Sequence, residues 1–338
     1  MRRLTITSAD FTDLTARARP GDDTVFVALR AGRATGWYGP LPEPVARAAR
    51  ALAPALDGVD ATDHQAVHAR LTAAAARTRA GSWAAGALDC AAWDLHARAE
   101  HRPVADLLTD RPLRDRLPAY ASWLTRDLSD PATLDHIPEV RAQGWAFTKW
   151  GLRHRPGTGG RALADRVNAA AAMCGPLAAD AVGTWPPGLQ AAFRAAVDPA
   201  ALIWLEDPAP AHTPRLYRLL DGLPLAMGER LTLADDTRAV LTTIRLSALT
   251  LDIVGCGGLT AALRLLASTT LPLFPHGRSL QPGLHLAAAR PDRVPAVEYR
   301  LAWEPGRQRL YTHPAEPDHG HLPLPPAPGL GAAPRSRP

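Results

Sequence analysis

The sequence predicts an α/β fold in which a modified (β/α)8 barrel (a TIM barrel) carries an N-terminal α+β capping domain. The first third has strand-like alternation followed by helical periods, and the rest has eight short apolar runs, each followed by a helix-length segment. Parallel strands that are buried on both faces read as continuous apolar runs, so eight such units suit a barrel. We expect the cap to span residues 1–116, completed by 305–338, and the barrel to span 117–304.

The predicted cap has its strands before its helices. Residues 4–8 and 24–29 alternate as strands do, and 36–40 is a third short strand that ends in a turn. Helical periods follow at 44–53, 63–79 and 82–99.

The predicted barrel strands are the eight apolar runs. They lie at 117–121, 145–148, 176–179, 201–205, 223–227, 248–251, 271–274 and 296–297. The closing stretch 305–338 is rich in proline and has no helical period, so we expect it to pack as extended chain or to fray.

Composition excludes several classes of protein. With 338 residues, 46% hydrophobic and 21% charged, the chain reads as globular, and without a signal peptide or an 18-residue apolar run we expect it to be cytoplasmic, with no membrane partner. Its three cysteines lack the spacing of a disulfide framework or a zinc site. The 38 Lys and Arg are spread among 33 acids without a basic block, so we expect no nucleic-acid partner despite the net charge of +5.

Lys149 is the only lysine in the chain. An arginine effectively never loses its proton, whereas the amine of a lysine is tuned by burial and nearby charge. A single lysine therefore suggests a chemical role, provided that its position agrees with other signals.

Its position does agree, because an ionisable residue follows each of seven successive runs at intervals of about one βα unit. These residues are Lys149, Asp180, Glu206, Glu229, Asp252, His276 and Glu298. In a barrel this spacing brings all seven side chains to the rim that carries active sites. Taken singly, each acid could instead cap a helix or form a salt bridge, and the histidine could be a turn residue.

The seven residues divide by chemistry. Asp180, Glu206 and Glu229 form an all-oxygen triad that suits a hard divalent cation such as Mg²⁺, and without a cation the three carboxylates would repel one another. Asp252 and His276 make a carboxylate–imidazole pair in which the aspartate orients the ring and raises its basicity. Lys149 is expected on the opposite side of the pocket.

Several motifs, in order along the chain, carry a resemblance to a known family. They lie at 86–95 (GALDCAAWDL), 103–108, 204–208, 228–230, 256–260, 275–277 and 328–331. With these motifs the chain resembles the enolase superfamily, mandelate racemase subgroup, over nearly its whole length.

The resemblance implies a capping domain over a modified barrel and a reaction that begins with removal of a proton α to a carboxylate. It also implies Mg²⁺ held by Asp180, Glu206 and Glu229, and an Asp252–His276 dyad. Glu298 matches a late-strand glutamate that would hydrogen-bond the developing oxyanion if its neighbours hold it protonated. A homo-oligomer, either a dimer or an octamer, is implied as well.

Two departures from the family pattern bear on function. Relatives with two opposed bases usually carry Lys-x-Lys, but here Lys149 is followed by Trp150 and Gly151, which disfavours stereochemical inversion by two bases. Val182 stands where the family commonly has asparagine, which weakens support around the first metal ligand.

Substrate choice in the family lies in loops over the barrel mouth. The candidates for contacting substrate are Arg17, Arg19, Trp37, Tyr38 and His154. The leading hypothesis is a Mg²⁺-dependent acid-sugar dehydratase, a carbon–oxygen lyase (hydro-lyase) acting on a small-molecule carboxylate. A racemase, epimerase or cycloisomerase that uses Lys149 as the opposing base remains open, and so does a non-catalytic metal-binding relative.

Overall fold

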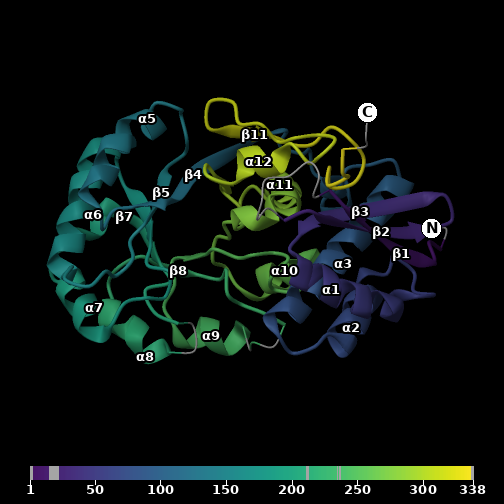
Figure 1. Ribbon diagram of the computed structural model, residues 1–338, viewed down its shortest axis with the longest axis horizontal. Coiled ribbons are helices and arrows are strands. Elements are labelled where there is room, and N and C mark those ends of the chain that lie inside the picture. The colour runs from purple at the N-terminus through teal and green to yellow at the C-terminus, as the bar shows by residue number, and fades with distance from the viewer. Residues whose placement is uncertain (1–2, 15–22, 211–212, 234, 236, 336–338) are drawn as a thin grey trace.

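The computed structural model describes residues 3–14, 23–210, 213–233, 235 and 237–335. In Figure 1 the N-terminal elements gather at the right, the barrel elements curve around the left and centre, and the C-terminal segment lies above. The predicted α/β barrel with an N-terminal cap is confirmed.

The cap is a three-stranded antiparallel sheet with helices packed on it. Its elements are β1 (Ser8–Asp13), β2 (Val25–Ala31), β3 (Ala34–Leu41), α1 (Glu43–Leu52), α2 (His64–Ala74), α3 (Arg79–Ala99) and α4 (Val104–Leu108). Gly36 lets α3 lie directly on β3, because a Cβ there would come within 2.3 Å of Ala91 O and Leu95 N. Thr78 begins α3 by accepting a hydrogen bond from the Gly81 N–H.

The barrel alternates strands and helices. Its strands, with one C-terminal addition, are β4 (Arg116–Asp127), β5 (Thr148–Gly151), β6 (Leu177–Asp180), β7 (Leu202–Glu206), β8 (Leu225–Met227), β9 (Ala248–Leu249), β10 (Val297–Arg300) and β11 (His321–Pro323). The helices are α5 (Ile137–Arg141), α6 (Gly160–Cys174), α7 (Pro187–Arg194), α8 (Pro214–Tyr217), α9 (Thr237–Thr243), α10 (Leu259–Ser268), α11 (Leu280–Ala289) and α12 (Glu304–Gln308).

The barrel strands pair in parallel in the order β10-β4-β5-β6-β7-β8-β9. The predicted run 271–274 makes only an isolated bridge, from Leu273 to Leu249, rather than a strand. It nevertheless links the two ends of the sheet, since Phe274 N–H donates to Leu249 O at 2.7 Å and Glu298 N–H donates to Pro275 O at 3.3 Å.

A separate apolar cluster fills the barrel beneath the carboxyl ends of the strands, and we call it the barrel floor. Its buried residues are Tyr120, Ala178, Trp204, Ala226, Ala248, Phe274 and Ala296, with Phe147 and Ile203 packed against them. The aromatic rings pack closely: Tyr120 stacks on Phe147 with centroids 4.5 Å apart and meets Trp204 edge-on at 5.7 Å.

The floor explains where the predicted site residues point. Side chains two positions apart on a strand face the same way, so each residue two positions after a floor residue also faces the barrel axis. The pairs are Phe147 and Lys149, Ala178 and Asp180, Trp204 and Glu206, Phe274 and His276, and Ala296 and Glu298.

Three further expectations about elements were wrong in detail. The first strand is Ser8–Asp13 rather than 4–8, because the backbone of Ile6 pairs with Val59 and Gly58 instead. The helix predicted over 63–79 ends at Ala74. The stretch 305–338 contains the short helix α12, whose Pro305 occupies the first turn where no backbone donor is needed, and the strand β11.

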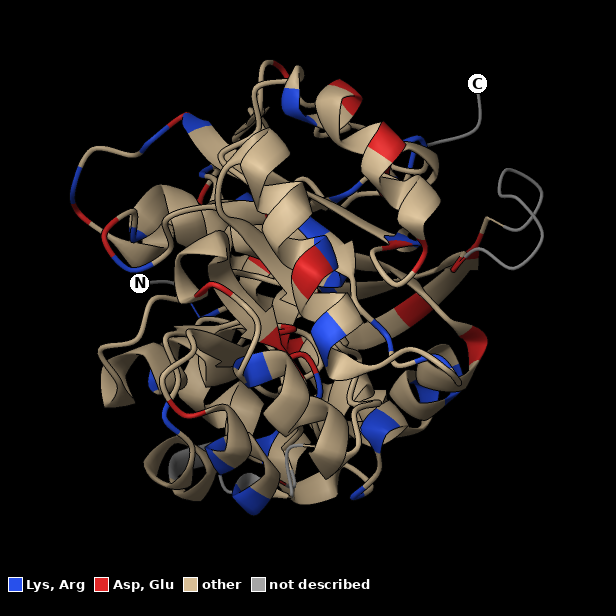
Figure 2. Ribbon diagram, turned by 90° about the vertical axis from the view of Figure 1, so that its left-hand side faces the viewer, with Lys and Arg blue, Asp and Glu red and all other residues tan. Residues whose placement is uncertain are grey.

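The C-terminal segment contacts both parts of the molecule. β11 pairs antiparallel with β4 of the barrel, while Tyr311 Oη donates to Gly39 O at the end of β3. No helix in the described residues is long and apolar enough to cross a membrane. Figure 2 shows positive and negative residues interspersed over the helices on the barrel side.

Candidate active site

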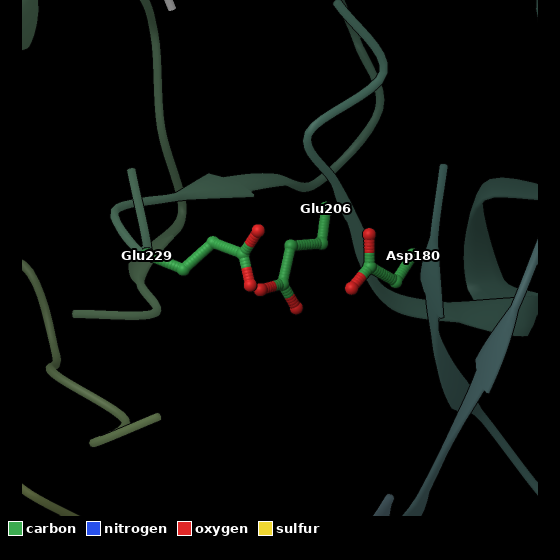
Figure 3. Close-up of side chains that lie close together, drawn as sticks. All are labelled: Asp180, Glu206 and Glu229. Carbon is green, nitrogen blue, oxygen red and sulfur yellow. The ribbon is translucent and has the colours of Figure 1, made fainter. Parts of the chain in front are cut away.

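Three carboxylates meet above the barrel floor. Asp180 ends β6, Glu206 ends β7 opposite it in register, and Glu229 follows β8. Each offers an oxygen atom within 4.8 Å of the others, and Figure 3 shows the three side chains reaching toward one space. Sheet register and strand alternation therefore produce the cluster that the sequence spacing predicted.

The charges in this cluster are not balanced by the protein alone. Burial and the nearby carboxylates of Glu206 and Glu229 hold the pKa of Asp180 well above its usual value. Glu206 is fully buried, and its Oε1 atom has no hydrogen-bond partner among the described residues. A hard divalent cation would accept these oxygens as ligands and remove the repulsion, so the donor set fits Mg²⁺.

Arg230 holds the loops that carry the three ligands. Its guanidinium donates to Val182 O at 2.9 Å, and its Nε lies 3.3 Å from Glu229 Oε1 and 3.5 Å from Asp207 Oδ2. Thus one side chain ties together the ends of β6, β7 and β8. Sequence reasoning missed this role, although Arg230 lies in the 228–230 motif.

Val182, two residues after the first ligand, has an unusual backbone conformation. Its φ is 53°, in the left-handed region that β-branched residues rarely adopt. Its N–H donates to Asp180 Oδ1 at 2.8 Å, which fixes that carboxylate. Asparagine tolerates this conformation better than valine, so the departure at Val182 carries backbone strain.

Lys149 is completely buried and bridges two acids. Its Nζ lies 2.9 Å from Glu206 Oε2 and 2.9 Å from Glu298 Oε1. Burial opposes its charge, but the two carboxylates outweigh burial and hold its pKa well above the usual value. Lys149 is therefore a fixed cation beside the carboxylate cluster.

Glu298 differs from the expectation of a protonated acid. Burial raises its pKa, but Lys149 and His276 outweigh burial and bring the pKa well below its usual value. Its Oε2 accepts a hydrogen bond from the Gly277 N–H at 2.6 Å. Glu298 is thus an anion that accepts hydrogen bonds, placed between Lys149 and His276.

His276 faces the cluster, but its link to Asp252 is looser than expected. The ring Nε2 lies 3.3 Å from Glu229 Oε2, and Nδ1 lies 3.9 Å from Asp252 Oδ2, beyond hydrogen-bond distance. Asp252 instead accepts hydrogen bonds from Ser279 Oγ and from the Gly255 N–H. Ser279 was not predicted, and no spacing signal singles it out.

The position of the missing second lysine is filled by an ion pair. A Cβ on Gly151 would come within 2.8 Å of both Arg153 Nη1 and Asp127 Oδ2. These two atoms pair at 2.9 Å, and Arg153 also donates to Leu124 O at 2.9 Å. A second lysine side chain has no room at Gly151 unless this pair moves.

A cavity of about 370 Å³ opens at the site. Glu229, Asp252 and His276 line one part of it. Four arginines also line it: Arg79, Arg278, Arg300 and Arg307. Sequence reasoning missed all four, because arginine is common throughout this chain and these residues share no motif.

Three of the five predicted substrate contacts lie in the described residues, and none of these three lines the cavity. Arg17 and Arg19 lie outside the described residues. Trp37, Tyr38 and His154 do not line this cavity, and Tyr38 is only 1% exposed because it faces the core of the cap. Pro40, from the same strand as Trp37 and Tyr38, does line it.

Comparison with known proteins identifies the family. Residues 24–109 match the family described as the N-terminal domain of mandelate racemase/muconate lactonizing enzyme, and residues 133–337 match the family described as enolase C-terminal domain-like. A curated relative, a "D-galactonate dehydratase family member" from Streptomyces bingchenggensis, is 26% identical over 295 residues, covering 73% of this chain and 70% of the relative.

Solved structures share the whole fold. A mandelate racemase/muconate lactonizing enzyme from Polaromonas sp. JS666 matches with a TM-score of 0.81 at 24% identity, covering 99% of this chain and 95% of the other. Another from a marine actinobacterium, in complex with magnesium, matches with a TM-score of 0.80 at 22% identity, covering 98% and 97%. The chain therefore belongs to the enolase superfamily, in the mandelate racemase/muconate lactonizing enzyme group.

Proposed function

We propose that the protein is a Mg²⁺-dependent acid-sugar dehydratase. The observation that carries the proposal is the meeting of a carboxylate triad with a buried lysine and a histidine, next to a cavity that Glu229 and His276 line. The name of the curated relative, a D-galactonate dehydratase family member, agrees with this chemistry. Asp180, Glu206 and Glu229 are the proposed ligands of Mg²⁺.

When bound, Mg²⁺ would supply positive charge that stabilises the anion formed as the α-proton leaves. Lys149 adds a second fixed positive charge for the substrate carboxylate, because its pKa is held well above neutrality. Glu298 forms an ion pair with Lys149 and accepts a hydrogen bond from the Gly277 N–H, so it keeps the lysine oriented.

His276 is the proposed acid–base group. Its imidazole removes the α-proton and returns a proton to the departing β-hydroxyl, so that one water leaves and the resulting enol becomes a 2-keto acid. Asp252 and Ser279 position the loop that carries His276, since Ser279 Oγ also accepts from the Val254 N–H at 3.0 Å.

A reaction led by one base fits this pocket better than two-base inversion. The Arg153–Asp127 pair occupies the space at Gly151, and the raised pKa of Lys149 makes its amine a poor proton acceptor. Elimination of water needs only one acid–base group, on the face of the substrate that His276 reaches.

The test is to incubate the Mg²⁺-loaded protein with a panel of sugar acids and to measure 2-keto acid formation, with a chelated sample as control. We expect at least one sugar acid to give a 2-keto acid in a Mg²⁺-dependent reaction. The proposal fails if no acid gives this product.

The remaining alternatives have their own readouts. Lys149→Arg keeps the charge but removes proton transfer, so a dehydratase should retain part of its turnover, whereas a two-base racemase should lose stereoinversion. Absence of Mg²⁺ binding by calorimetry after chelation would favour a non-catalytic relative.

A further inference from the structure

The residues that line the cavity fall into two chemically different sets. One set is Glu229, Asp252 and His276, which belong to the proposed reaction. The other set contains the arginines, and Trp303 and Leu310 line the same cavity. We call the set Arg79, Arg278 and Arg307 the arginine end.

Arg300 is left out of this set because the protein already satisfies it. Its Nη2 and Nε both lie within hydrogen-bond distance of Glu304 Oε1, at 2.6 and 3.2 Å. The other Glu304 oxygen accepts from Gln308 at 3.0 Å. Arg300 and Glu304 therefore form a neutral, buried pair.

The arginine end is not neutralised in this way. Arg278 and Arg79 lie over the Trp83 ring, at 4.5 and 5.4 Å from its centroid, and neither makes an ion pair with a carboxylate in the described part of the chain. Arg307 donates from Nε to Tyr311 Oη, a neutral group, at 3.2 Å. Asp23 also lines the cavity, but one carboxylate does not balance three guanidinium groups.

The environment of Arg278 shows the same imbalance. Burial lowers its pKa and the charges of Arg300 and Arg307 lower it further, and together these effects outweigh the opposing carboxylates of Asp252 and Asp23. A partly buried guanidinium with other cations nearby gains from an added anion. Arg278 also lies two residues after His276, and its backbone N–H donates to His276 Nδ1 at 3.3 Å, so the arginine end borders the proposed acid–base group.

We propose that the arginine end binds a second anionic group of the substrate, so that the substrate is an acid sugar with a terminal oxyanion in addition to its reacting carboxylate. This inference rests on the proposed function, because it assigns a second group of the same substrate. Guanidinium groups pair with carboxylate or phosphate oxygens in a bidentate geometry, and both groups share this chemistry. A cavity of about 370 Å³ is within the size of small-molecule sites.

The experiment compares three ligands that differ only at C6: D-galactonate, galactarate and D-galactonate 6-phosphate. Their affinities for the protein in excess Mg²⁺ are measured by calorimetry, which does not depend on turnover. We expect galactarate or the 6-phosphate to bind at least about tenfold more tightly than galactonate, the effect of one charge-assisted hydrogen bond. Whichever of the two binds more tightly identifies the terminal group.

Substitutions assign the effect to the arginine end. Arg278→Gln should bring the affinity ratio between the doubly anionic ligand and galactonate close to one, and Arg79→Gln, at the exposed start of α3, should reduce it by less. Arg50→Gln is the matched control, because Arg50 also lies over an aromatic ring, 5.1 Å from Phe11, but not in the cavity. It should leave the ratio unchanged.

The inference is overturned if the wild-type protein binds neither galactarate nor the 6-phosphate more tightly than galactonate. It is also overturned if neither Arg278→Gln nor Arg79→Gln changes this affinity ratio. Formation of 2-keto acid is scored separately on the same samples. If the doubly anionic ligand still binds more tightly than galactonate but no 2-keto acid forms, dehydration is rejected and the anion subsite is retained. If 2-keto acid forms but the affinity ratio is near one, the anion subsite is rejected and dehydration is retained.

Discussion

The barrel floor and the layer above it are built on the same strands, two residues apart, yet they have opposite chemistry. The floor is aromatic and alanine-rich, and its rings pack against one another. The layer above holds buried carboxylates around one lysine. The floor is stable as it stands, whereas the upper layer carries repulsion that a bound cation would relieve.

The two layers are also connected. Trp204 belongs to the floor, but its indole Nε1 donates to Glu206 Oε2 at 3.2 Å. The Nζ of Lys149 likewise lies 5.9 Å from the centroid of the Tyr120 ring. The floor therefore positions the upper layer. Substitutions of floor residues can separate their packing from the support that they give to the proposed Mg²⁺ ligands.

The largest effect is expected from the floor. Trp204→Ala should lower the free energy of unfolding by about 3–5 kcal/mol, because it opens a cavity among packed rings. Trp204→Phe should keep most of the stability but lose the hydrogen bond to Glu206 and weaken Mg²⁺ binding. Urea unfolding measures the loss of packing, and Mg²⁺ calorimetry measures the loss of ligand support. Equal Mg²⁺ affinities for Trp204→Phe and wild type would show that the layers are independent.

In the upper layer, a substitution that removes a charge should not lower the stability of the metal-free protein. Asp180→Asn removes one repelling charge, so in the absence of Mg²⁺ the variant should be as stable as the wild type or more stable. Its Mg²⁺ affinity should fall by about 100- to 1,000-fold through loss of a charged ligand. The exposed Asp135→Asn is the control, and a lower melting temperature of metal-free Asp180→Asn would contradict this account.

Asp89 offers a buried carboxylate outside the cavity. Burial raises its pKa to about 7. Since the folded state then holds a proton that the unfolded state releases from about pH 4 upward, stability should fall as pH rises from about 4 to about 7, by on the order of 4 kcal/mol. Asp89→Asn should flatten this dependence in urea unfolding measured at several pH values, and an unchanged slope would rule out Asp89 as its source.

The smallest effect is expected at Val182. Val182→Asn should relieve the left-handed backbone and raise stability by about 1 kcal/mol. The Val182→Ala variant, which keeps a Cβ but is not branched, is the matched comparison in thermal unfolding. A loss of stability in Val182→Asn would mean that packing of the valine outweighs its strain.

The fold could be predicted because buried parallel strands leave apolar runs at regular intervals. The cluster of Asp180, Glu206 and Glu229 followed from the same intervals, since strand ends meet at one rim. Short runs such as 271–274 still gave no strand, because pairing depends on neighbours that the sequence does not show.

Other parts of the site could not be predicted from spacing. Arg278, Arg79 and Arg307 come from separate elements and look like any other arginine in this chain. The charge state of Glu298 depends on Lys149 and His276 at once, so it follows only from their three-dimensional arrangement.

The most direct measurement is hydrogen–deuterium exchange at the α-carbon of a bound sugar acid, followed by nuclear magnetic resonance in D₂O. The wild-type protein with Mg²⁺ should exchange the α-proton or lose it to product, and His276→Asn should do neither while still binding Mg²⁺. Exchange that survives in His276→Asn would contradict the assignment of the base. Absence of exchange in the wild-type protein with every sugar acid would contradict the account as a whole.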